Sequence, residues 1–180
     1  MTTPAPGRSC AGCTMCCKVL SIDALSKPAD QWCPNCQVGQ GCSIYAQRPA
    51  ECSTFNCMWL IDVDVPEALA PRDSRMVLAG TTGAIIIHVD TSRRGAWRKP
   101  PFHPLFRRWA TGMAPRGARL LVREGREYFA ILPDRDKALG ILQPGWILVP
   151  TQREMAGSVS YDIELARADD PRAGSALRII

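Results

Sequence analysis

The apolar positions beyond residue 60 follow the patterns of strands. Residues 74–79 and 84–90 each contain a strand-like apolar run, and a segment with two glycines at 80–83 separates them. The second run includes Ile85-Ile86-Ile87, which is β-branched throughout and is typical of a buried strand. The pattern therefore predicts two neighbouring strands joined by a turn.

The rest of this part predicts one helix and more strands. Between residues 102 and 113, apolar residues such as Phe106 and Trp109 recur near helical spacing, which predicts an amphipathic helix. The turn at Glu124-Gly125-Arg126 predicts a hairpin. Further strands are predicted at residues 118–123, 127–132, 146–150 and 159–166, and a helical turn at 134–139. We therefore expect the α+β class, with an antiparallel sheet in a unit over residues 61–180.

The first 60 residues have a different character. We expect residues 1–9 to form a flexible tail. We expect residues 10–60 to form a cysteine module, whose loops are rich in Pro, Gly, Asn and Gln. Within it, we expect a short strand or helical turn at 19–25 and a helical turn that begins at Arg48-Pro49. The module either packs on the α+β unit or is integrated with it in one domain. In such loops, metal is expected to replace an apolar core as the organiser.

Composition narrows the class of protein. The chain has 180 residues, of which 46% are hydrophobic and 22% are charged, as in globular proteins. No apolar run approaches the roughly 18 residues of a membrane span, and the first eight residues lack the apolar core of a signal peptide. We therefore expect a cytoplasmic location, where thiols stay reduced.

Nine cysteines lie in the first 57 residues, and none follows them. They are Cys10, Cys13, Cys16, Cys17, Cys33, Cys36, Cys42, Cys52 and Cys57. In a reducing compartment, a dense group of thiols is more typical of metal binding than of disulfides, and an odd number cannot pair completely. We therefore predict that all nine are metal ligands.

The spacing of the thiols favours more than one zinc ion. Thiolates are soft ligands, and the pairs Cys10/Cys13 and Cys33/Cys36 have the two-residue separation typical of tetrahedral zinc sites. The adjacent side chains of Cys16 and Cys17 diverge, which favours two metals or a bridging thiolate. We predict about two to three zinc ions per chain. The alternatives are iron bound by thiolates, or an iron–sulfur cluster, which needs only about four of the thiols.

The cysteine pattern also resembles a known family. The run C-x2-C-x2-C-C is followed by Gly41-Cys42-Ser-Ile-Tyr45-Ala-Gln-Arg48-Pro49-Ala-Glu-Cys52-Ser-Thr-Phe55-Asn-Cys57. Over residues 10–60 this resembles the YkgJ-type CxxCxxCC cysteine cluster family, whose members are described as zinc- or iron-chelating. The resemblance implies metal binding and supports some ligands more than others: Cys13, Cys16, Cys17, Cys42 and Cys52 first, and then Cys10. It implies no catalytic residue.

Three residues of that signature have structural interpretations. Tyr45 and Phe55 are expected to pack beside the cysteines as the core of the module. Arg48 is expected to donate to local carbonyl groups or to offset the negative charge of thiolates. The sequence contains no glycine-rich phosphate loop and no nucleophile elbow, so it identifies no catalytic residue and leaves open whether the protein is an enzyme.

A basic segment follows the cysteine module. Residues 91–126 contain ten Lys and Arg and a single acidic residue, Glu124, interleaved with aromatic side chains such as Trp97 and Trp109. The basic residues are Arg93, Arg94, Arg98, Lys99, Arg107, Arg108, Arg116, Arg119, Arg123 and Arg126. Such a segment suits nucleic acid, an acidic protein partner or an anionic surface, and equally a solvated face with the aromatic rings turned inward.

Taken together, the sequence favours a metal-binding protein that acts by binding a partner. In this interpretation zinc holds the cysteine module in its fold. The rival interpretations are an iron-containing redox protein or enzyme, and a carrier that hands its metal on. Neither the partner nor a substrate is identified by any motif.

Overall fold

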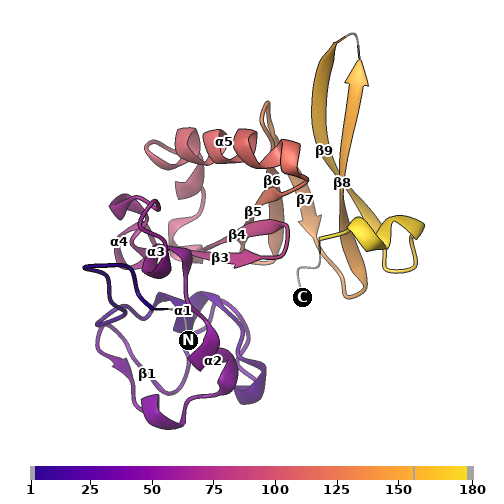
Figure 1. The fold of residues 1–180 in the computed structure, drawn as a ribbon. Coiled ribbons are helices and arrows are strands. Elements are labelled where there is room, and N and C mark those ends of the chain that lie inside the picture. Colours follow the sequence, from indigo (N-terminus) through magenta and orange to yellow (C-terminus); the bar gives the residue numbers. More distant parts are fainter. Residues whose placement is uncertain (1–2, 156, 178–180) are drawn as a thin grey trace. The chain divides into compact units, whose positions relative to one another are not determined.

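A computed structural model describes residues 3–155 and 157–177, which form two compact units (Figure 1). Unit 1 is Met1–Ala79 together with Ile87–Ala96, and unit 2 is Gly80–Ile86 together with Trp97–Ile180. We had expected a boundary near residue 60. The observed boundary instead passes through a β-hairpin, so neither unit is a single continuous segment.

Unit 1 consists of short helical turns and very short strands. Its elements are α1 (Met15–Val19), η1 (Asp23–Leu25), β1 (Cys36–Gln37), β2 (Gly41–Cys42), η2 (Tyr45–Gln47), α2 (Ala50–Thr54), α3 (Met58–Ile61), η3 (Glu67–Leu69), α4 (Pro71–Ser74) and η4 (Thr91–Arg93). The helical turn predicted after Arg48-Pro49 is confirmed as α2, with Pro49 as its N-cap residue. One small apolar cluster, built on Met15, Val19 and Val77, lies against the cysteine segments.

The beginning of the chain is held within unit 1. The Ala5 N–H donates to the Leu60 carbonyl at 2.8 Å, and Ala5 is buried. Arg8 donates to the carbonyl oxygens of Trp59, Asp62 and Val65. These contacts lie inside the range 1–9 that we expected to be a flexible tail. Residues 1 and 2 of that range lie outside the described residues.

A buried carboxylate joins the first helix to the last strand of unit 1. Asp90 is fully buried and accepts from Lys18 Nζ at 2.7 Å, from Arg75 Nη2 at 2.9 Å and from the Ser92 N–H at 3.0 Å. Burial opposes ionisation of Asp90, but the donors Lys18 and Ser92 outweigh it, so its pKa lies below 3.8. Asp90 is therefore a charged anchor for two basic side chains.

Five strands form one sheet, in the order β3-β4-β5-β6-β7. They are β3 (Met76–Thr81), β4 (Ala84–Val89), β5 (Arg119–Glu124), β6 (Glu127–Ile131) and β7 (Asp136–Ile141). The Arg119 N–H donates to the Gly83 carbonyl at 2.9 Å, so β5 begins beside the start of β4. These two strands therefore run in the same direction, whereas β5, β6 and β7 pair antiparallel. The α+β class is confirmed, with a mixed sheet rather than a purely antiparallel one.

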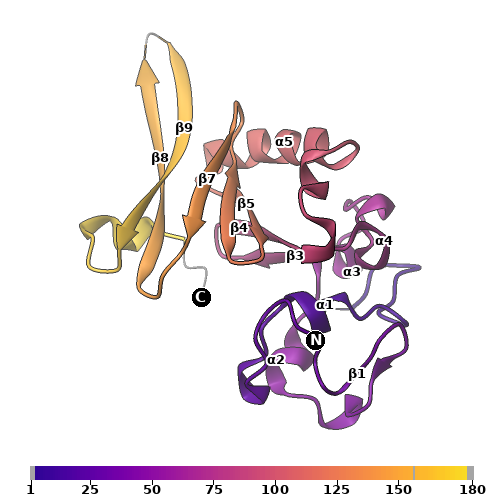
Figure 2. The same ribbon diagram turned by 180° about the vertical axis from the view of Figure 1, so that it is seen from behind.

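Helix α5 (Phe102–Met113) has the predicted bounds. It packs on β5 and β6 of unit 2 and buries Phe106 and Ala110 (Figure 2). The short turns η5 (Ala96–Arg98) and η6 (Ala114–Arg116) precede and follow it, and Gly117 ends the second with φ +74°. No helix in the described part of the chain has the length and apolar character of a membrane span.

Strand β7 corrects a prediction. Residues 134–139 were expected to form a helical turn, but residues from Asp136 onward pair with β6, in the register Ile131↔Asp136 and Ala130↔Lys137. The segment contains charged residues, which are uncommon in strands. It forms a strand because it pairs with β6, and such pairing cannot be predicted from the local sequence. The strands predicted around 118–123 and 127–132 are confirmed as β5 and β6.

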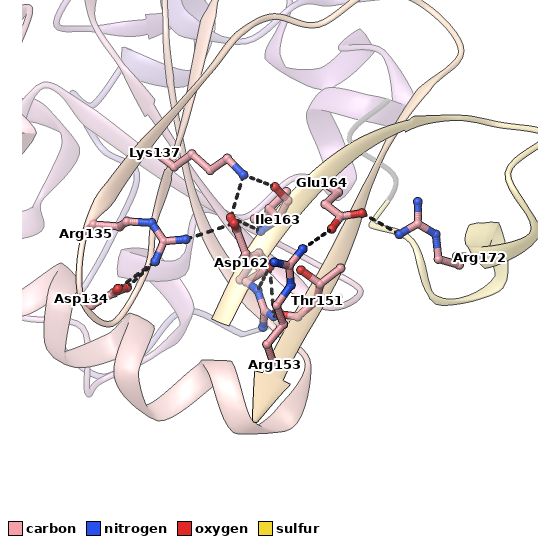
Figure 3. A network of polar contacts seen from close by, with 10 residues as sticks. Asp134, Arg135, Lys137, Thr151, Arg153, Asp162, Ile163, Glu164 and Arg172 are labelled. Atoms are coloured by element: carbon pink, nitrogen blue, oxygen red, sulfur yellow. Dashed lines mark hydrogen bonds and ion pairs between the residues drawn. The ribbon is translucent and has the colours of Figure 1, made fainter. Parts of the chain in front are cut away.

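A long two-stranded ribbon completes unit 2. Strand β8 (Trp146–Met155) pairs antiparallel with β9 (Ser158–Arg167), and the turn η7 (Pro171–Ser175) follows. Polar contacts join the ribbon to β7 (Figure 3): Asp162 accepts from Lys137 at 2.7 Å and from Arg135 at 3.1 Å. The apolar core of the unit lies beneath these contacts and includes Leu121, Leu148 and Ile163.

Candidate metal centre

The Cys10/Cys13 and Cys33/Cys36 pairs adopt the same closed turn. The Cys13 N–H donates to the Cys10 carbonyl at 2.9 Å, and the Cys36 N–H donates to the Cys33 carbonyl at 3.0 Å. In the first turn, Gly12 has φ +71°, and a Cβ there would lie 3.2 Å from the Gly39 carbonyl oxygen. Such turns place both thiols of a pair on one side, as a tetrahedral zinc site requires.

Backbone contacts bring the cysteine segments together. Cys16 and Cys17 lie in helix α1, and the Cys17 carbonyl accepts from the Cys33 N–H at 3.0 Å. Strand β1 then places Cys36 directly opposite Cys42 on β2. Residues far apart in the sequence are thus neighbours through main-chain hydrogen bonds, which do not depend on any thiol.

All nine thiols are free, and they differ in exposure. Cys33 is buried, Cys10 is exposed, and the other seven are half-buried. Phe55 packs with Cys13 and Cys57 against the small apolar cluster, as expected. Tyr45 does not join that core: its side chain is 61% exposed, and the Arg48 guanidinium lies 3.9 Å from its ring centroid.

The thiols form one electrostatically linked group. Among the described residues, Cys17 has the largest number of these interactions with other thiols. The linked pairs are Cys10 with Cys13 and Cys17, Cys17 with Cys16 and Cys36, Cys36 with Cys33, Cys52 with Cys17, Cys33 and Cys42, and Cys57 with Cys10 and Cys13. Every one of the nine belongs to this chain of neighbours.

Ionising these thiols without a nearby cation is unfavourable. Burial, together with neighbouring thiols, raises the pKa of Cys36 and of Cys57 to about 11, from 9.0. A hydrogen bond with Cys16, and then burial, raises the pKa of Cys17 as well. These three thiols are therefore protonated at neutral pH, and a metal ion would displace their protons on binding.

A lysine that the sequence did not single out lies beside the thiols. Lys27 is 4% exposed, and its ammonium donates to the carbonyl oxygens of Lys18, at 2.9 Å, and of Leu20. It interacts electrostatically with Cys33, Cys17 and Cys16, while burial lowers its pKa. A fixed positive charge at this place suits a group of thiolates. No motif marks Lys27, because its position depends on the backbone bridge between residues 22 and 27.

The side chains are close, but they do not converge on one point. Among residues 3–155 and 157–177, no group of three or more His, Cys, Asp or Glu side chains is arranged to hold a metal ion. The donor set fits zinc in its chemistry, because it consists of thiols on two closed Cys-x-x-Cys turns. Binding would require the thiol side chains to rotate toward the metal.

The ten residues of the basic segment are divided between the two units. Arg93 and Arg94 belong to unit 1, and the other eight belong to unit 2. Arg119 is buried and donates to the carbonyl oxygens of Ala114 and Thr151, so it has a structural role. Trp97 is fully buried, as an inward-turned ring would be.

Comparison with known proteins adds no relative. No protein-family model, no curated protein and no solved structure matches this chain. Membership of the YkgJ-type cysteine cluster family therefore remains a prediction, which depends on the spacing of the cysteines and on the residues around Tyr45 and Arg48.

Proposed function

We propose that this chain is a cytoplasmic metal-binding protein in which the nine cysteines hold about two to three zinc ions. The observation that carries the proposal is that main-chain hydrogen bonds and strand pairing bring cysteine segments distant in the sequence together within unit 1: Cys33 bonds to Cys17, and Cys36 lies opposite Cys42. The zinc keeps the module folded, and the protein acts by binding a partner. Each thiol contributes as a thiolate ligand, and Lys27 offsets part of the resulting negative charge.

The thin apolar core beside the cysteines supports a structural role for the metal. Among the residues that the structure describes, the cluster next to the thiols has Met15, Val19 and Val77 as its buried members, and Leu20 and Phe55 pack against it partly buried. Loops without a substantial core need another source of stability, and structural zinc supplies folding free energy directly. Zinc also accounts for more of the thiols than a single iron–sulfur cluster, which takes about four.

Elemental analysis of the anaerobically purified protein, with an absorption spectrum of the same sample, tests this proposal. We expect about two to three zinc ions per chain and no visible absorbance, because zinc has a filled d shell. Iron together with sulfide and a visible band would contradict the zinc assignment and favour a redox protein. Zinc that a chelator removes without any unfolding would contradict the structural role and favour a metal carrier.

Metal uptake is expected to release protons. Zinc binds the thiolate form of cysteine, and the raised pKa values of Cys36 and Cys57 keep these two thiols protonated at neutral pH. Adding zinc to the reduced, metal-free protein should therefore release protons from the coordinating thiols. Zinc affinity should fall as the pH is lowered, because protons return to the thiols. A pH-stat titration in weak buffer measures the number released, and magnesium serves as the control ion.

A release well below one proton for each of the nine cysteines would contradict this expectation. An equal release with magnesium would contradict it as well. The first result would mean that most cysteines are not ligands. The second would mean that the protons come from carboxylates or from other groups.

A further inference from the structure

The start of helix α5 and the start of strand β7 carry a charged cluster within unit 2. Asp136 accepts from Arg107 Nη2 at 2.7 Å and lies 3.0 Å from His103 Nε2, while Arg98 Nε is 3.9 Å away. The four side chains are between 21% and 41% exposed. Solvent therefore reaches the cluster, and two guanidinium groups share one carboxylate.

Two aromatic rings lie close to the guanidinium of Arg98. Its guanidinium carbon lies 4.0 Å from the ring centroid of Trp97 and 4.5 Å from that of Phe129, and these two rings pack on each other at 5.5 Å. Apart from Asp136, the described part of the chain offers Arg98 no ion-pair or hydrogen-bond partner. Stacking of this kind fixes the orientation of the guanidinium while leaving its paired N–H groups available.

Donors exceed acceptors in this cluster. Arg107 donates through Nη1 to the Leu132 carbonyl and through Nη2 to Asp136, so the charge of Asp136 is already matched. The Trp97 indole N–H is buried and has no acceptor within the described residues. Buried donors without acceptors are rare in folded proteins. The cluster thus has a surplus of positive charge and of hydrogen-bond donors.

We propose that this cluster, centred on Arg98 with His103 beside it, binds a phosphate group. The paired N–H groups of a stacked guanidinium match two oxygens of a phosphate, and such charge-assisted bonds are stronger than neutral ones. The fully buried Trp97 ring supports Arg98 and cannot itself stack on a base. The phosphate can belong to a small phosphorylated molecule or to a nucleic-acid backbone, and the experiment separates these sources. This site lies in unit 2 and does not depend on metal in unit 1.

Titration of the whole protein with pyrophosphate at low ionic strength, followed by calorimetry, tests the proposal. We expect saturable binding, which Arg98→Gln weakens by about tenfold or more, because the substitution removes a charge-assisted contact. Arg98→Lys should weaken binding less, since it keeps the charge but loses the paired N–H geometry. Arg126→Gln, on an exposed residue of the same unit, is the matched control and should leave the affinity unchanged.

Two results would overturn the proposal: the absence of pyrophosphate binding, or equal weakening by Arg98→Gln and Arg126→Gln, which would indicate general attraction to positive charge. A thymidine oligonucleotide provides the second arm. Binding that depends on Arg98 with both ligands supports the site and identifies nucleic acid as a source. Binding of pyrophosphate alone supports the site for small phosphorylated molecules. The purity and fold of each variant are checked by circular dichroism.

Discussion

Exchanging Cys17 for serine is expected to remove zinc from unit 1 and to prevent its folding. Cys17 is linked to thiols from three other segments, among them Cys36 and Cys52, and its carbonyl accepts from Cys33. Serine keeps the helix and its hydrogen bonds but replaces a soft thiolate by a hydroxyl, which is a poor zinc ligand at neutral pH. We expect a loss of at least about one zinc ion per chain and insoluble or protease-sensitive protein.

Zinc content and limited proteolysis, measured side by side, check this expectation. Ser53→Ala is the matched control, because Ser53 is an exposed neighbour of Cys52 whose hydroxyl donates to the Ala50 carbonyl. Cys10→Ser should have a milder effect, since Cys10 is exposed. A Cys17→Ser protein with full zinc content and normal protease resistance would show that the central thiol is not a ligand.

Replacing Asp90 by asparagine is expected to destabilise unit 1 by about 3–5 kcal/mol, the usual cost of removing one partner from a buried charged group. Asparagine has nearly the same shape, but it leaves Lys18 and Arg75, which are 15% and 31% exposed, without their opposite charge. Denaturant unfolding at neutral pH measures the loss. Asp169→Asn, at an exposed position, is the control and should change stability by less than about 0.5 kcal/mol.

The same carboxylate predicts a dependence on pH. Because the pKa of Asp90 lies below 3.8 in the folded protein, its contribution is present above about 3.8 and is lost as the pH falls through the folded value. Asp90→Asn should therefore remove part of the acid sensitivity of the protein. An Asp90→Asn protein as stable as the parent at neutral pH would show that the ion pairs of Asp90 contribute nothing.

The helix and hairpins that were predicted best have local signals. Helix α5 has apolar residues at helical spacing, so its existence and its bounds could be predicted from the sequence. The turn between β5 and β6 contains Gly125, whose φ of +64° favours glycine. Strand β7 lacks such signals and depends on pairing with β6, which explains why a helical turn was expected there.

In the candidate site, too, features that depend on the local sequence could be predicted, whereas features that depend on long-range contacts could not. The two Cys-x-x-Cys turns follow from spacing alone, and both are present. The position of Lys27 beside the thiols could not be predicted, and neither could the bond between Lys18 and Asp90, which are 72 positions apart. Long-range contacts of this kind leave no periodic pattern and no motif in a single sequence.

The division of unit 1 into two segments has a consequence for synthesis of the protein. The cysteines leave the ribosome first, but the chain departs from unit 1 at Ala79 and returns to it only at Ile87. Lys18 and Arg75 therefore have to wait for Asp90 before the buried ion pairs can form. Unit 1 therefore includes more of the chain than the cysteine module of residues 10–60. The nascent chain carries nine free thiols before Asp90 emerges and completes the buried ion pairs.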